Sequence, residues 1–156
     1  MKRAQLLREL MSNLENGFPQ GEHHHIKVMV EKGLNISKVD SALIHKFCNM
    51  CAAAIGLEND YKCYLSDDRK RSKIMTTAIC DFSHHNIRIY CHSRALADIL
   101  RSIAHEMFHL RQNELHLVPN KPKQHHLSPV EWHANAAAGS LLSYFAQKVG
   151  RDKIYR

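Results

Sequence analysis

The chain has 156 residues, of which 44% are hydrophobic and 24% charged, the composition of an ordinary globular protein with enough length for one core. No apolar run is long enough to cross a membrane, and the first ten residues carry charges where a secretory signal needs an uninterrupted apolar stretch. We therefore expect a single domain over residues 1–156 in the cytoplasm. The formal net charge of +7 permits association with DNA or an acidic protein without identifying either.

The spacing of apolar residues predicts an α+β fold. The first helix is ended by Gly17 and Pro19, and the last begins with Ser128 as N-cap and Pro129 at its first position. Turn chemistry at 83–86 predicts a hairpin, so we expect an antiparallel sheet packed beside the last two helices. In chain order the predicted elements are a helix over 2–15, a strand over 26–30, a helix over 37–55, strands over 61–65, 74–82 and 87–91, and helices over 94–112 and 128–149.

The cysteines predict no disulfide framework. Their number, five, is odd, and without a secretory signal we expect reduced thiols. Cys48 and Cys51 form a CxxC pair, which can be half of a zinc knuckle or a redox pair. Because the pair lies in an apolar helical segment and no second CxxC follows, we interpret both as core residues.

The sequence His105-Glu106-Met107-Phe108-His109 is an HExxH motif inside a predicted helix. Residues four apart lie on one face of a helix, so both imidazoles can reach one ion. Glu106, beside the first histidine, is then placed to act as the general base toward water. The motif predicts a zinc site, although 13 histidines in the chain make chance matches easier.

A catalytic zinc site needs a third protein ligand. The metzincin continuation is absent, because Gln112 and Leu115 replace its glycine and third histidine. Glu131, at the start of the next helix, is the better candidate, with Asn135 one turn further along to support a ligating histidine through its amide. A capping box with Ser128 is a competing role for Glu131.

The segment His105–His109, followed by Glu131-x-x-Ala134-Asn135-x-x-Ala138-x-x-Leu141-Leu142, resembles the ImmA/IrrE family of small zinc metallopeptidases, whose members carry HExxH and then ExxANxFAxxLL. The resemblance covers roughly residues 89–145. It differs at Ala137, where the family has phenylalanine, and at Phe108, where a glycine often precedes the second histidine. It implies a small zincin-like, gluzincin-type protease with His105, His109 and Glu131 as Zn²⁺ ligands and Glu106 as base. Family members, often from phages or mobile elements, cleave or inactivate a DNA-binding repressor.

Other interpretations remain open. SprT/Spartan-type proteases, which act on proteins bound to DNA, are similar in having HExxH followed by a loop histidine; His126 would then be the third ligand. A catalytically inactive basic binding domain and a metal-dependent hydrolase of small molecules are further alternatives. If the protein cleaves peptides, we expect an edge strand, 87–91, to hold the substrate by strand addition.

Overall fold

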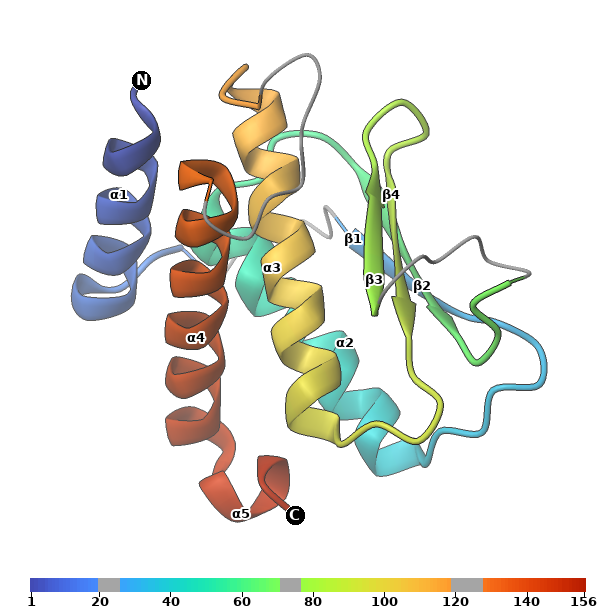
Figure 1. Cartoon of the computed structure of the whole chain (residues 1–156). Coiled ribbons are helices and arrows are strands. Elements are labelled where there is room, and N and C mark those ends of the chain that lie inside the picture. Colours follow the sequence, from blue (N-terminus) through green and yellow to red (C-terminus); the bar gives the residue numbers. More distant parts are fainter. Residues whose placement is uncertain (20–25, 71–76, 119–127) are drawn as a thin grey trace.

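A computed structural model describes residues 1–19, 26–70, 77–118 and 128–156 of the chain. Each predicted helix and strand has a counterpart among these residues, and the short helix α5 is an additional element (Figure 1). The elements are α1 Arg3–Asn16, β1 Ile26–Val30, α2 Lys38–Ile55, β2 Tyr61–Ser66, β3 Ala78–Asp81, β4 Asn86–Tyr90, α3 Leu96–Glu114, α4 Pro129–Val149 and α5 Arg151–Ile154.

The sheet is mixed, and the prediction of an antiparallel sheet was wrong. Its order is β1-β2-β4-β3; β1 and β4 each pair parallel to β2, while β3 pairs antiparallel to β4. The hairpin predicted at 83–86 is present. After β2, however, the chain goes to the far edge to form β3 and returns as β4 between them. The alternation of apolar residues along a strand does not indicate which strand will lie beside it. The parallel pairing of β1 and β4 with β2 was therefore missed.

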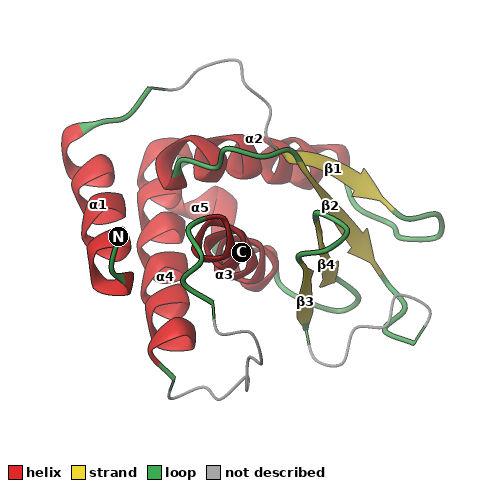
Figure 2. Ribbon diagram, turned by 90° about the horizontal axis from the view of Figure 1, so that it is seen from above, coloured by secondary structure: helices red, strands yellow, loops and turns green. Residues whose placement is uncertain are grey.

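The helices cover one face of the sheet (Figures 1 and 2). α2 and α3 contact the strands, α4 packs against α3, and α1 packs against α4. The core between these layers is apolar and includes an edge-to-face pair, Phe47 of α2 and Phe145 of α4, with ring centroids 5.1 Å apart. No helix among the described residues has both the length and the apolarity needed to cross a bilayer.

Local chemistry fixes the ends of the two capped helices. The Ser37 hydroxyl accepts a hydrogen bond from the Asp40 backbone N–H at 3.1 Å at the start of α2, and Gly56 ends that helix in the left-handed conformation, φ +80°. Ser128 caps α4 in the same way. Cys48 and Cys51 are fully buried with free thiols, as predicted for core residues.

Candidate metal centre

The HExxH histidines lie one turn apart on α3, and their rings approach each other edge to face. The ring centroids are 4.6 Å apart at an interplanar angle of 85°, and the two Nε2 atoms are 3.0 Å apart. Helical spacing alone accounts for this proximity. The predicted pair of imidazoles therefore faces one point.

Glu131 reaches the same point from the first turn of α4. Its Oε2 lies 2.9 Å from His105 Nε2 and its Oε1 lies 2.9 Å from His109 Nε2. One potential ligand atom from each of these three residues lies within 4.8 Å of the other two. The structure thus brings together the three residues that the sequence predicted as ligands.

The capping role and the ligand position of Glu131 use different atoms. Its backbone N–H donates to the Ser128 hydroxyl at 3.3 Å, while its carboxylate faces His105 and His109. Half of the predicted capping box is therefore present, and the other half is replaced by the contact with the histidines. The N-cap holds the first turn of α4, and that turn directs the carboxylate toward α3.

A chain of hydrogen bonds fixes the protonation of His109. The Val130 carbonyl can only accept, so the Gln112 amide nitrogen donates to it at 3.2 Å. The Gln112 oxygen must then face His109 Nδ1, 2.7 Å away, and accept its proton. A neutral His109 consequently presents a lone pair at Nε2, toward Glu131.

This arrangement suits a cation. A lone pair on His109 Nε2 and a carboxylate oxygen 2.9 Å away are both acceptors, so a proton or a metal ion must lie between them. Two imidazole nitrogens and a carboxylate are a ligand set that catalytic zinc takes in proteins, with a further position left for water or substrate. The residues present therefore fit a zinc ion.

The charges in the site shift three pKa values. Hydrogen bonds from His105 and His109 hold the pKa of the Glu131 carboxyl well below its usual range. Burial opposes protonation of His109, but its hydrogen bond to Glu131 and the neighbouring carboxylates outweigh burial and raise its pKa. Burial raises the pKa of Glu106, against the opposing effect of the two histidines.

A hollow of about 260 Å³ opens at the site, and Glu106, 8% exposed, lies in its wall. Asn135 also lines this hollow, and the His109 N–H donates to Gln112 rather than to Asn135. In the sequence, Gln112 stands where metzincins have a glycine, and no supporting role was predicted for it. Its position three residues after His109 was the available signal. The lining residues are Thr77, Ala78, Arg101, Ser102, His105, Glu106, Glu131 and Asn135.

The other candidate ligand, His126, lies outside the described residues. The hairpin-tip histidine His84 is on the turn before β4, as predicted, and its Nδ1 lies 2.8 Å from Asp81. Beside Glu131, Trp132 is 61% exposed and its ring lies 5.3 Å from that of His133.

Comparisons of the chain with protein-family models, curated proteins and solved structures found no match.

Proposed function

We propose that this protein is a zinc-dependent endopeptidase with a small zincin-like domain. The observation that carries the proposal is the convergence of His105, His109 and Glu131 on one point at the wall of a hollow that also contains Glu106. Three such ligands with a neighbouring glutamate are the chemistry of metal-assisted hydrolysis. The resemblance to ImmA/IrrE proteases supports an intracellular protein as substrate, with a DNA-binding repressor of a phage or mobile element as the first class to test.

Each residue has a distinct role in this proposal. Zinc, when bound by His105, His109 and Glu131, supplies a Lewis acid that acidifies water and polarises a scissile carbonyl. Glu106 takes a proton from the attacking water onto its carboxylate and delivers it to the leaving amine. Burial favours the protonated form of Glu106 and so suits it to hold that proton.

The strand predicted to hold the substrate, 87–91, is not an edge strand. Strand β4, which contains most of 87–91, lies inside the sheet between β2 and β3, so it has no edge to offer. Strand β3 is an edge of the described sheet, and its end near Ala78 borders the hollow with Glu106. We propose that an extended substrate pairs with β3.

Strand pairing can be tested with peptides methylated on single backbone nitrogens. Once a cleaved peptide is known, methylation at every second position should abolish cleavage, because those N–H groups would face β3. Methylation at the intervening positions should leave it intact. Equal tolerance at both sets of positions would exclude pairing with β3.

The decisive experiment measures zinc per chain and peptide hydrolysis side by side for the wild type, Glu131→Ala and Glu106→Gln. We expect one zinc per wild-type chain, loss of zinc from Glu131→Ala, and zinc retained in Glu106→Gln with hydrolysis reduced by roughly 10²–10⁴-fold. Glu9→Gln, on the exposed side of α1, is the matched control for loss of a carboxylate. Full hydrolysis by Glu106→Gln would overturn the proposal.

The same experiment separates the alternatives. Zinc retained by Glu131→Ala and lost from His126→Ala would favour the SprT-like protease. Metal-independent partner binding without hydrolysis would favour the inactive basic domain. Hydrolysis confined to small esters or amides would favour a non-peptide hydrolase.

A further inference from the structure

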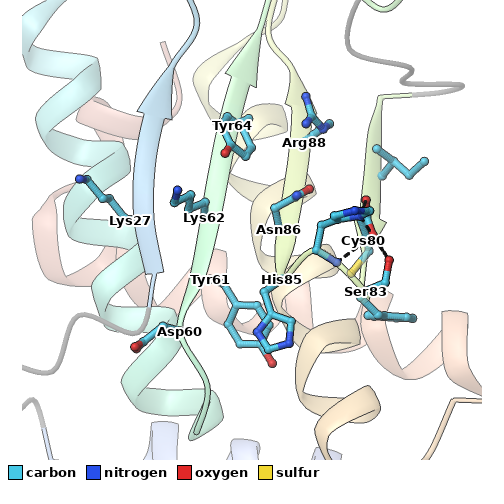
Figure 3. A pocket seen from close by; sticks show the side chains of 14 residues that line it. Lys27, Asp60, Tyr61, Lys62, Tyr64, Cys80, Ser83, His85, Asn86 and Arg88 are labelled. Atoms are coloured by element: carbon cyan, nitrogen blue, oxygen red, sulfur yellow. Dashed lines mark hydrogen bonds and ion pairs between the residues drawn. The ribbon is translucent and has the colours of Figure 1, made fainter.

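The face of the sheet turned away from the helices is hollowed and carries the cationic side chains of Lys27, Lys62 and Arg88 beside Asp60 and Asp81. A hollow of about 1160 Å³ lies over it, more than four times the volume at the metal centre. Figure 3 shows Lys27, Lys62, Tyr64 and Arg88 side by side across β1, β2 and β4 in front of the sheet. In the register of the sheet, Lys27 lies beside Lys62, and Tyr64 lies beside Arg88. A pair of lysines is therefore followed, two residues further along β2, by a pair formed by an aromatic ring and a guanidinium group.

Two guanidinium groups stack on tyrosine rings along this face. Arg88 lies over Tyr64, 4.8 Å from the ring centroid, and Arg69 lies over Tyr90 at 4.2 Å. Aromatic rings and guanidinium planes are the surfaces on which unpaired bases stack, and the same arginines attract phosphate. The repeat of this pair along the face suits a linear ligand.

The acidic groups around the hollow are engaged. Glu31 lies 3.7 Å from Arg88, and Asp81 accepts hydrogen bonds from Ser83 and His84. Lys27 and Lys62 are exposed, and neither forms an ion pair with another described residue. Asp60 also lines one end of the hollow. The lysines are thus available to phosphates along the floor.

A separate observation comes from Asn86, at the floor of the same hollow (Figure 3). The residue is 6% exposed, and its side-chain oxygen has no hydrogen-bond partner among the described residues. A buried polar atom without a partner costs free energy unless a ligand or water satisfies it. A carboxamide can pair with the hydrogen-bonding edge of a base.

We propose that this open face binds single-stranded nucleic acid, with Lys27 and Lys62 contacting phosphates and the Tyr64–Arg88 pair stacking bases. Edge strand β3 separates this surface from the metal centre: Ile79 and Asp81 line the open-face hollow, and Ala78 lines the other. The inference does not depend on proteolysis or on zinc.

The test is fluorescence anisotropy of a labelled mixed-sequence DNA single strand of about 20 nucleotides, longer than the site of one typical binding fold, at several salt concentrations. Replacing Lys27 and Lys62 together by alanine should reduce the slope of log affinity against log salt by about 1.4, since each lost phosphate contact contributes about 0.7 for single strands. Tyr64→Ala should weaken binding roughly tenfold and leave that slope unchanged, because stacking is not an ionic contact.

The matched control replaces Lys46 of α2 and Lys153 of α5, both exposed on helices, and so removes the same charge elsewhere. We expect it to keep wild-type affinity, and circular dichroism should show that all variants are folded. An RNA strand of the same sequence should compete, and addition of a chelator should change nothing. Absence of wild-type binding at low salt, an equal loss in the control, or equal competition by duplex DNA or poly-glutamate would overturn the proposal.

Discussion

Gln112 connects the two helices that carry the candidate ligands. Its amide accepts from His109 and donates to the Val130 carbonyl, one residue before Glu131. A single side chain therefore sets the orientation of one candidate ligand and positions the turn that carries another. Such partners of ligating histidines affect metal affinity strongly although they do not touch the ion.

Gln112→Leu keeps the side-chain volume and removes both hydrogen bonds. We expect zinc affinity to fall about 10–100-fold and the free energy of unfolding of the metal-free protein to fall by about 1–3 kcal/mol, because two buried groups lose their partner. Competition with a chromophoric chelator and urea denaturation measure the two effects.

Gln112→Glu separates the effect on zinc affinity from the effect on stability, because a carboxylate still accepts from His109 but no longer donates to the Val130 carbonyl. This variant should retain most of the zinc affinity and lose stability. Wild-type zinc affinity in Gln112→Leu would show that the hydrogen-bond chain does not support the metal centre.

At the scale of elements, the first turn of α4 contains an N-capping hydrogen bond and also carries the candidate ligand Glu131. Ser128→Ala and Ser37→Ala remove equivalent caps from α4 and α2. Each should cost about 1 kcal/mol of stability. Only Ser128→Ala should also weaken zinc binding, by up to about fivefold, the equivalent of 1 kcal/mol.

The comparison is made by denaturant unfolding and zinc titration of both variants. Ser37 is the matched control because its helix contributes no described ligand. An equal effect of the two substitutions on zinc affinity would show that the Ser128 cap does not determine the position of Glu131.

The sequence predicted the helices better than the sheet, for a physical reason. Helix positions follow from local apolar spacing and from caps such as Ser37, Ser128 and Gly56, all of which act within a few residues. Strand partners depend on contacts between distant segments, so the placement of β4 between β2 and β3 had no local signal. The same division applies to the site. His105, Glu106, His109 and the contact of Gln112 with His109 follow from spacing, whereas the hydrogen bond from Gln112 to the Val130 carbonyl requires knowing that α4 packs beside α3.

At the scale of the whole molecule, the candidate ligands join two helices that are separate in sequence, so metal binding should stabilise the fold. Zinc at about 100 times its dissociation constant adds about 2.7 kcal/mol, which for a chain of this size raises Tm by about 5–10 °C. Thermal unfolding with zinc and with chelator measures the shift. Glu131→Ala should abolish it, and an undiminished shift in that variant would place the ion elsewhere.

The buried thiols predict a loss of stability in alkali. Burial raises the pKa of Cys91 from 9.0 to about 11, so the folded state keeps the thiol proton where the unfolded chain has lost it. Stability should therefore fall as pH rises from 9 toward 11, with a slope of about 1.4 kcal/mol per pH unit for one such group. Urea denaturation at several pH values measures the slope.

Cys91→Ala should lower that slope by about 1.4 kcal/mol per pH unit, because Cys51, Cys63 and Cys80, whose pKa values are also raised, remain in the variant. It should also lower stability at pH 8 by removing buried volume. Parallel stability curves for the wild type and Cys91→Ala would contradict the assignment to this thiol.

Trp132 is the single tryptophan of the chain and follows Glu131 directly. Its indole is 61% exposed, so its emission senses solvent and whatever approaches the start of α4. The protein thus contains its own optical reporter at one position, without a label or an engineered residue. Quenching by a paramagnetic ion such as Co²⁺, or a spectral shift on addition of a peptide, would report binding at the candidate metal centre. The same emission should not respond to a nucleic acid bound on the far side of the sheet.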